Sequence, residues 1–360
     1  MGSTHAIGIV GLGVISRAYL DTLAGHPGIR IAAVADLDAS RAEATAAEIE
    51  GCRALTTAEL MADSDIDTVL NLTIPAAHAE VALAAISAGK AVFGEKPLAA
   101  SFAEAQTVMD AAEQAGVPVG CAPDTVLGTG VQTARAAVDG GMIGSPVGAT
   151  ASWVSPGHEH WHPAPDFYYQ AGGGPLLDMG PYYVTSLVQL LGPVVAVSGA
   201  ASRAHRTRVI ATGPRAGESV RVEVDTHIAG VLEHAGGAIS TITMSFDGVA
   251  TSARPIEVYG TEGALTVPDP NMHAGEVRVR MRGADDWSPV PVSAGYEHAA
   301  RGIGLLDFVA GDRRASGDMA LHVLDVMESL HRAAADHARV VLATTVERPP
   351  VVPLTASASA

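Results

Sequence analysis

Three small residues near the start of the chain have the spacing of a phosphate-binding turn. Gly11 and Gly13 follow the first apolar run, and Ser16 stands three positions later. The first glycine permits a tight turn from strand to helix, the second lets a pyrophosphate approach the backbone, and a small third residue lets the helix pack closely on the strand. The helix N-terminus adds amide donors and a partial positive charge. The pattern predicts a dinucleotide site with backbone contacts at Gly11, Gly13, Val14, Ile15 and Ser16.

A carboxylate at the end of the next apolar run fits the same site. Asp36 can accept hydrogen bonds from the ribose hydroxyls of an adenosine and would repel a 2′-phosphate. The sequence therefore favours NAD, with NADP as the less favoured cofactor because Arg41 could pair with a phosphate. A purely structural role for Asp36, as a cap of the following turn, is the alternative.

Two further motifs carry ionisable side chains in a defined order. The first is Gly94-Glu95-Lys96-Pro97, and the second is the glycine run 172–174 followed by Asp178 and Tyr182. Residues four positions apart lie on one face of a helix, so Asp178 and Tyr182 should point into one site. A phenol, with an ordinary pKa of about 10, is a poorer base at neutral pH than an imidazole.

These motifs, together with the glycine turn and Asp36, resemble the Gfo/Idh/MocA family of NAD(P)-dependent oxidoreductases. The resemblance covers nearly the whole ordered chain and implies that Lys96 lies beside nicotinamide and substrate as an acid/base, with Glu95 positioning Lys96 or the cofactor. Burial and a cationic ring would bring the pKa of such a lysine toward working pH. In the family a histidine stands where this chain has Tyr182. Either Tyr182 shares the proton transfer with Lys96, or it only holds a substrate hydroxyl while Asp178 orients the substrate.

A segment rich in aromatic residues precedes the glycine run. Trp161 and Tyr168 could stack on the apolar face of a sugar ring while His162 reaches a hydroxyl. His158, His160 and His162 would face one side of an extended strand, so a metal site is a second interpretation. Flanking prolines and the lack of a nearby cysteine favour a pocket wall or a structural loop, and we expect no metal.

Other polar residues follow the later strands of the first domain. Thr73, Pro75 and His78 follow a predicted strand at its carboxyl end, where nucleotide sites form, and relatives use the matching turn against the cofactor. Asp124 follows the last strand and is expected either to contact substrate or to cap the next helix.

The resemblance implies hydride transfer between NAD(H) and a secondary alcohol or ketone of a sugar, inositol or related polyol. The alternative is glycoside cleavage by transient oxidation, elimination and re-reduction, with no net turnover of the cofactor. A third possibility, a non-catalytic protein that binds a dinucleotide, is disfavoured by the presence of both Lys96 and Asp178.

The elements that must position these residues are of two kinds. Up to about residue 122, apolar runs alternate with amphipathic segments, which predicts parallel strands joined by helical crossovers. The expected strands are His5–Val10, Arg30–Ala35, Thr68–Leu72, Lys90–Phe93 and Pro118–Cys121. Later runs alternate β-branched and polar residues, as antiparallel strands with one covered face do. They include a long strand over Val220–Leu232.

The sequence thus predicts an α/β protein. A Rossmann domain over 1–122, a doubly wound parallel sheet, precedes an α+β substrate domain over 123–348 with a large open-faced, mainly antiparallel sheet. Residues 349–360, rich in proline and small residues, should be a poorly ordered tail. Relatives associate through the open sheet, so we expect a homodimer or homotetramer.

Composition narrows the functional class. A net charge of −17 argues against a nucleic-acid partner, because such binding needs clustered lysine and arginine. Cys52 and Cys121 form no metal or disulfide pattern. The chain has neither a leader-like start nor a long apolar stretch, so we expect a cytoplasmic protein with no membrane partner.

Overall fold

The computed structural model describes residues 4–358, which form two compact units. The first unit runs to Leu127 and also contains Tyr296–Leu321 and the segment from Thr355. The second unit contains Gly128–Gly295 and His322–Leu354. The sequence predicts contiguous domains 1–122 and 123–348. In the structure the chain returns to the first unit with Tyr296–Leu321, which we call the returning segment. Backbone pairing of this returning segment with the last strand of the first sheet accounts for the difference.

The first unit is built on a six-stranded parallel sheet of order β3-β2-β1-β4-β5-β6. Its strands are β1 (His5–Val10), β2 (Ile29–Ala35), β3 (Arg53–Ala54), β4 (Thr68–Asn71), β5 (Ala91–Gly94) and β6 (Val119–Cys121). Strands β1, β2 and β4 are mostly apolar and almost entirely buried, as strands covered on both faces must be, whereas the short edge strand β3 is exposed. The order reverses between β1 and β4, and ligands of such sheets bind outside the carboxyl ends at this point.

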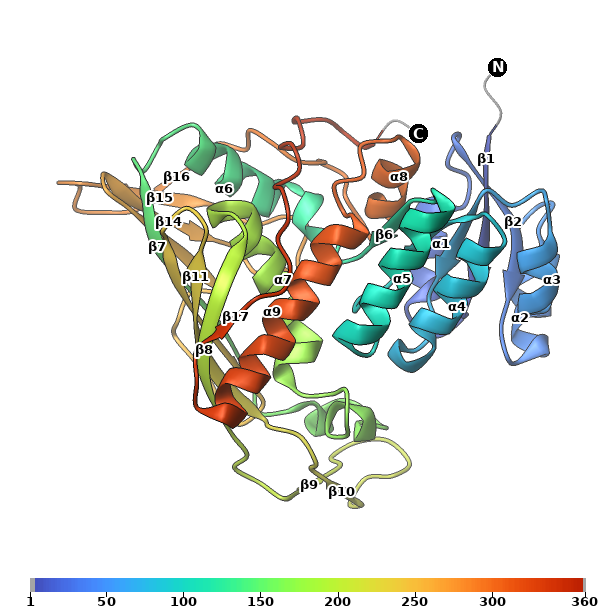
Figure 1. Cartoon of the computed structure of the whole chain (residues 1–360), viewed down its shortest axis with the longest axis horizontal. Helices are drawn as coiled ribbons and strands as arrows, with labels where there is room; N and C mark the ends of the chain where they lie inside the picture. The colour runs from blue at the N-terminus through green and yellow to red at the C-terminus, as the bar shows by residue number, and fades with distance from the viewer. Residues whose placement is uncertain (1–3, 359–360) are drawn as a thin grey trace. The chain divides into compact units, whose positions relative to one another are not determined.

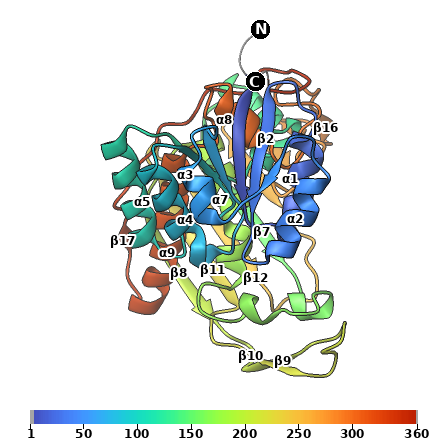
Figure 2. The same cartoon turned by 90° about the vertical axis from the view of Figure 1, so that its right-hand side faces the viewer.

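Helices cover both faces of this sheet, with α1 and α2 on one face and α4 and α5 on the other (Figure 2). The helices of the unit are α1 (Ser16–Leu23), α2 (Ala39–Ala47), α3 (Thr57–Ala62), α4 (Pro75–Ser87), α5 (Phe102–Ala115), η1 (Thr125–Leu127) and α8 (Ile303–Val309). Side chains of Asp38, Thr56 and Ser101 cap α2, α3 and α5. The Rossmann fold predicted from the alternating pattern is therefore confirmed.

The second unit has a nine-stranded sheet of order β16-β15-β14-β13-β7-β12-β11-β8-β17. Its strands are β7 (Pro146–Val154), β8 (Val194–Ser202), β11 (His227–His234), β12 (Ile239–Ser245), β13 (Ile256–Gly260), β14 (Gly263–Val267), β15 (Arg278–Met281), β16 (Ser288–Pro289) and β17 (Val340–Val341). Strands β7 and β12 pair in parallel, and the other neighbours pair antiparallel. The predicted, mainly antiparallel sheet is confirmed.

Helices α6 (Thr129–Asp139) and α7 (Pro175–Leu191) lie on one face of this sheet (Figure 1). The last helix, α9 (Gly317–Asp336), starts in the first unit and ends in the second. Among the described residues of the second unit, no helix covers the other face in Figure 1, so within this unit the sheet is open on that side. None of the helices within residues 4–358 is long and apolar enough to cross a bilayer.

The prediction of one long strand over Val220–Leu232 was wrong. This stretch contains β10 (Ser219–Arg221), which pairs with β9 (Thr207–Val209) in a separate ribbon, and then β11. Between them the backbone bonds to other segments: the amide of Glu223 donates to the carbonyl of Tyr169, and Arg203 donates to the carbonyl of Val222. The alternation of apolar and polar residues continues through β10 and β11. Only the hydrogen bonds with Tyr169 and Arg203, which are distant in sequence, show that strand pairing stops between the two.

Residues 349–358 also differ from the expected disordered tail. Val352 is fully buried, its amide donates to Oε1 of Gln132, and its carbonyl accepts from Gly295. Thr355 forms a bridge with Tyr296. Burial of the Val352 side chain and the hydrogen bonds of its backbone order this segment, although its composition is typical of a disordered tail. Residues 359–360 of the expected tail lie outside the described residues.

Candidate functional site

The glycine turn after β1 has the geometry that a bound phosphate requires. Gly11 has a φ of +95°, and a Cβ there would lie 2.7 Å from the carbonyl carbon of Leu72 and the amide nitrogen of Thr73. The Gly11 amide donates to the carbonyl of Ala35 at 2.9 Å. A Cβ on Gly13 would meet nothing within 4 Å. The turn therefore requires glycine at position 11, and the space beside Gly13 is open.

The N-terminus of α1 is available to an anion. Ser16 packs against the sheet, and its hydroxyl donates back to the carbonyl of Gly13 at 2.7 Å. No side chain of the described residues caps this helix, which begins after Ile15. Its first amides thus lack the partner that a capping side chain would give them, and a pyrophosphate fits this place.

Three large apolar side chains are exposed at the same edge of the sheet. Val14 and Leu37 are fully exposed and Ile74 is 69% exposed, and they follow the carboxyl ends of β1, β2 and β4. Apolar side chains beside a phosphate site can pack on the flat rings of a dinucleotide. The sequence reasoning missed Leu37 and Ile74, although each is an apolar residue just beyond a strand-end turn.

Asp36 is held at the end of β2 by the backbone and by one arginine. Its carboxylate accepts the amides of Leu12 at 2.7 Å and Asp38 at 2.9 Å. Both oxygens lie 3.3 Å from a guanidinium nitrogen of Arg41. The residue suited to a ribose hydroxyl and the residue suited to a 2′-phosphate are therefore paired with each other, and this geometry fits either form of the dinucleotide.

The turn after β4 is braced by the imidazole of His78. The Thr73 hydroxyl donates to Oδ1 of Asn71 at 2.6 Å, and Pro75 begins α4. His78 is 2% exposed, and its ring nitrogens lie 3.0 Å from the carbonyl oxygen of Thr73 and 2.6 Å from that of Pro97. His78 thus joins the turn to the Glu-Lys-Pro motif from inside the unit, whereas the sequence predicted a direct cofactor contact.

Glu95 holds the backbone at Lys96. Its side chain accepts the Tyr19 hydroxyl at 2.9 Å and the amide of Lys96 at 3.0 Å. Burial raises the pKa of Tyr19, and nearby Glu95 raises it further, so the phenol stays a neutral donor. Lys96 is half-buried, and the peptide bond between Lys96 and Pro97 is cis. These contacts fit the positioning role that the resemblance implies for Glu95.

Asp124 lies inside the first unit. It is fully buried, and its Oδ2 accepts the amides of Gly302 at 2.7 Å and Gly304 at 3.2 Å at the start of α8. The guanidinium of Arg301 lies 3.7 Å from Oδ1. Asp124 thus contacts the start of α8 and Arg301, which sequence spacing does not reveal, and its expected contact with substrate stays a prediction.

In the second unit, the glycine run leads into α7. Gly174 has a φ of +95°, and a Cβ on Gly173 would lie 2.7 Å from the carbonyl oxygen of Tyr168. Asp178 and Tyr182 lie one turn apart on the helix, and Tyr182 is 5% exposed. The carboxylate of Asp178 is 2.8 Å from Nε2 of His158, a contact that sequence reasoning missed.

The three histidines of the preceding segment do not share one face. Residues His158–His160 form the short 3-10 helix η2 rather than an extended strand. His158 contacts Asp178, His160 lies 3.7 Å from the carboxylate of Glu159, and Nδ1 of His162 accepts the amide of Ala164. Within residues 4–358, no group of three or more histidine, cysteine, aspartate or glutamate side chains is arranged to hold a metal ion.

The predicted substrate residues of this segment lie together. The rings of Trp161 and His162 have centroids 5.3 Å apart, and those of His162 and Tyr168 are 5.6 Å apart. Trp161 is 58% exposed and the neighbouring Phe167 is 55% exposed. We call Trp161, His162, Phe167 and Tyr168 the aromatic cluster. Its exposed ring surface suits packing against the apolar face of a sugar.

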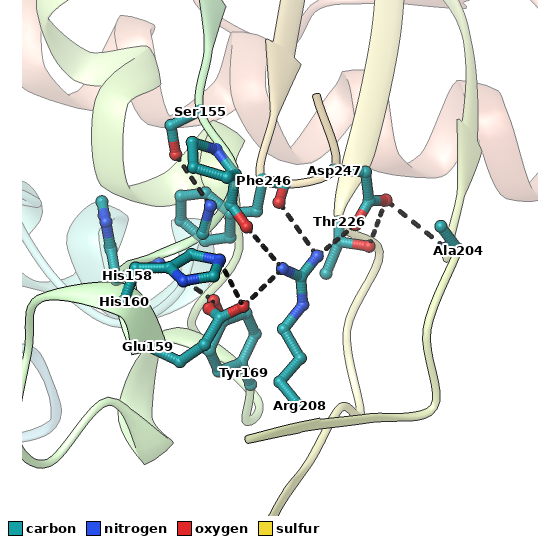
Figure 3. A network of polar contacts seen from close by, with 12 residues as sticks. Ser155, His158, Glu159, His160, Tyr169, Ala204, Arg208, Thr226, Phe246 and Asp247 are labelled. Carbon is teal, nitrogen blue, oxygen red and sulfur yellow. Dashed lines mark hydrogen bonds and ion pairs between the residues drawn. The ribbon is translucent and has the colours of Figure 1, made fainter. Parts of the chain in front are cut away.

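A buried ion-pair network anchors this segment to the sheet (Figure 3). The guanidinium of Arg208, on β9, donates to Glu159 at 2.8 Å and also binds Asp247, which accepts the Thr226 hydroxyl at 2.7 Å. The Tyr169 hydroxyl donates to Glu159 as well. Burial raises the pKa of Tyr169, and the hydrogen bond to Glu159 adds to the shift, so this donor stays neutral. The network fixes the aromatic cluster beside the first turn of α7.

Comparison with known proteins agrees with this architecture. Residues 5–122 match the model of an oxidoreductase family with an NAD-binding Rossmann fold, and residues 131–266 match the GFO/IDH/MocA C-terminal domain. A crystal structure of an NAD binding oxidoreductase from Klebsiella pneumoniae aligns with a TM-score of 0.81 at 23% identity, over 95% of this chain and 100% of that chain. At that identity the likeness shows the fold alone.

Two curated relatives are similar over most of their length. Inositol 2-dehydrogenase 3 from Saccharopolyspora erythraea is 30% identical over 295 residues, which are 79% of this chain and 80% of the relative. The 1,5-anhydro-D-fructose reductase from Ensifer adhaerens is 27% identical over 334 residues, which are 91% of this chain and 96% of the relative. This chain therefore belongs to the Gfo/Idh/MocA family of oxidoreductases, and its Rossmann unit binds NAD(P).

Proposed function

We propose that this protein transfers a hydride between NAD(H) and a secondary alcohol or ketone of a sugar, an inositol or a related polyol. The observation that carries the proposal is the aromatic cluster beside Asp178, because exposed rings next to a carboxylate suit a ring with an apolar face and many hydroxyls. The two relatives named above act on an inositol and on an anhydro sugar by their names, which supports the same class.

In this proposal Lys96 is the acid/base, and Asp178 and Tyr182 orient the substrate. The nicotinamide supplies the hydride acceptor or donor when it is bound. Lys96 exchanges a proton with the oxygen of the reacting carbon, and Glu95 holds the Lys96 backbone for that exchange.

The decisive experiment is turnover of defined probes. We expect reduction of NAD⁺ with myo-inositol, or oxidation of NADH or NADPH with 1,5-anhydro-D-fructose, followed at 340 nm. If neither probe reacts, a wider panel of sugars, polyols and glycosides follows, and absence of any cofactor turnover across it would contradict the proposal. Release of sugar from a glycoside without net NADH would instead identify redox-neutral cleavage.

The role of Lys96 is tested by Lys96→Ala. Acid/base groups contribute about 10²- to 10⁴-fold, so kcat should fall by that factor while NADH affinity, measured by fluorescence titration, is retained. Added small primary amines should restore part of the rate, because they supply the missing proton carrier. A loss of less than about tenfold would remove Lys96 from this role.

For the cofactor, we propose a preference for NAD over NADP that rests on Asp36. An aspartate at this place receives ribose hydroxyls and repels a 2′-phosphate, and it also occupies Arg41. Asp36→Ser removes the repulsion and releases Arg41, so the ratio of kcat/KM with NADP to that with NAD should rise by at least about tenfold. Arg41→Ala should leave the preference for NAD in place, and a switch toward NADP in that variant would contradict the assignment.

We also propose that the open face of the nine-stranded sheet joins copies of this chain in a homodimer or homotetramer. Register places Val231, Thr241, Thr150 and Glu257 in one row across four strands of that face. Val231 is 39% exposed, and Ile239, two positions before Thr241 on the same face, is 54% exposed; exposed apolar side chains on a sheet face commonly mark a partner's place. Light scattering at micromolar concentration should give a multiple of 36.6 kDa, and Thr241→Arg should reduce it. A wild-type monomer would contradict this assembly.

A further inference from the structure

His158 has a protein partner at each ring nitrogen. The residue lies in η2, and it is 6% exposed. Its Nε2 is 2.8 Å from Oδ2 of Asp178, and its Nδ1 is 3.1 Å from the indole nitrogen of Trp161. Both ring nitrogens are therefore engaged with protein side chains, Asp178 and Trp161, rather than with solvent.

The indole nitrogen decides which tautomer the imidazole adopts. An indole N–H can only donate, so Nδ1 of His158 must be the acceptor and carries no proton. In the neutral ring the proton then sits on Nε2, where it is donated to the carboxylate of Asp178. Trp161, His158 and Asp178 therefore form one directed chain of hydrogen bonds that ends at the carboxylate.

Packing holds the imidazole ring in this orientation. Its centroid lies 4.2 Å from that of Tyr168 and 4.7 Å from that of Phe246. The amide of His158 donates to the hydroxyl of Tyr169, which also binds Glu159 in the network around Arg208. Both the ring and its backbone are thus fixed from the sheet side.

We propose that His158 is a positioning residue: its Nε2–H orients the Asp178 carboxylate toward a substrate hydroxyl, and Trp161 fixes the tautomer that makes this possible. The inference rests on the proposed function for its effect on turnover, but not for its geometry. Because both nitrogens are engaged, His158 does not itself exchange a proton with substrate. The exposed ring of Trp161, if it stacks on substrate, connects substrate binding to the orientation of Asp178.

A matched pair of variants separates this role from simple packing. His158→Gln keeps an amide donor at the position of Nε2, whereas His158→Asn keeps one only near the position of Nδ1. With myo-inositol or 1,5-anhydro-D-fructose as the probe, His158→Asn should lower kcat/KM by about tenfold to a hundredfold, the range expected for one charge-assisted hydrogen bond. His158→Gln should keep most of the wild-type value. Equal losses in both variants would overturn the proposal.

A double-mutant comparison tests whether His158 acts through Asp178. In an Asp178→Ala background, which removes the acceptor of the Nε2–H bond, His158→Asn should cause no further loss of kcat/KM, because groups that act as a unit are not additive. A further loss of about tenfold would show an independent role and overturn the proposal. NADH affinity, which depends on the other unit, should be unchanged in all these variants. Unchanged near-ultraviolet circular dichroism of Trp153 and Trp161, whose rings lie against His158, shows that the second unit folds.

A measurement without turnover keeps the two proposals distinguishable. In protein labelled with ¹⁵N-histidine, the His158 ring, assigned by its loss in His158→Gln, should carry its proton on Nε2. Trp161→Phe keeps an aromatic ring but removes the indole donor, so it should shift the ring toward a mixture of tautomers. An Nδ1–H tautomer in the wild type would overturn the positioning role. If no compound of the whole panel is turned over but the Nε2–H tautomer is found, the proposed function fails and the orientation of Asp178 stands.

Discussion

Replacing Arg208 by methionine should destabilise the second unit strongly. Arg208 is 7% exposed and Glu159 is 4% exposed, and the guanidinium is the cation shared by the carboxylates of Glu159 and Asp247. Removing one partner of a buried ion pair costs about 3 to 5 kcal/mol, because the remaining charge stays buried without compensation. Here two carboxylates lose their cation at once, so the upper part of this range applies.

The expected change is large enough to measure by thermal and denaturant unfolding. For a unit of about 200 residues, each kcal/mol shifts the melting temperature by about 2 to 4 °C, which gives a decrease of about 10 to 20 °C. The tryptophans report on this unit, since Trp153 and Trp161 lie against His158. Near-ultraviolet circular dichroism and tryptophan fluorescence should therefore show the same shift in midpoint.

Two comparisons make the result specific. Arg221→Met removes an arginine whose side chain is 82% exposed and 3.6 Å from Glu223, so it should change stability by less than about 1 kcal/mol. Arg208→Met combined with Glu159→Gln should be less destabilising than the two single effects added together, because the buried charge is removed with its partner. An Arg208→Met protein within about 1 kcal/mol of the wild type would refute the reasoning that the network anchors this segment.

Two other outcomes follow from single residues. Gly11→Ala should weaken NADH binding by at least about tenfold in a fluorescence titration, because φ is +95° and the new Cβ would press on Leu72. Gly89→Ala is its control, since φ is +73° but a Cβ there meets nothing within 4 Å, and equal loss of binding in both would count against the site. Burial lowers the pKa of His322 to about 4, below its ordinary 6.5. The unfolded state therefore binds the proton first as pH falls, and His322 should remove about 3 kcal/mol of stability between pH 7 and pH 4. Denaturant midpoints of wild type and His322→Gln across this range should converge at low pH, and parallel curves would contradict the assignment.

Local patterns predicted most of the first unit. Apolar strands alternating with amphipathic helices specify parallel pairing, and Gly11 and Asp36 mark the nucleotide edge because the tight turn and the ribose contact depend on residues close in sequence. The sequence did not predict that Leu37 and Ile74 are exposed at this edge, because their exposure depends on how the neighbouring strands are arranged.

In the second unit, the glycine run was visible in the sequence as the start of a helix. The pair Asp178 and Tyr182 could be predicted because a spacing of four residues places both side chains on one helix face. The partner of Asp178 was not readable, since His158 lies 20 residues earlier and reaches the helix only through a short 3-10 turn. The extended geometry assumed for the three histidines would have placed His158 differently.

The sequence by itself determined the class of fold, the nucleotide turn and the helix that carries Asp178, because each depends on backbone sterics and on side-chain periods over a few residues. Only the tertiary structure decided that Asp124 serves the returning segment, that Val352 joins a core, and that Arg208 anchors the aromatic cluster. Buried charges and orphaned backbone groups must find partners wherever the chain brings them, and the choice among distant partners is made by packing of the whole unit rather than by local preference.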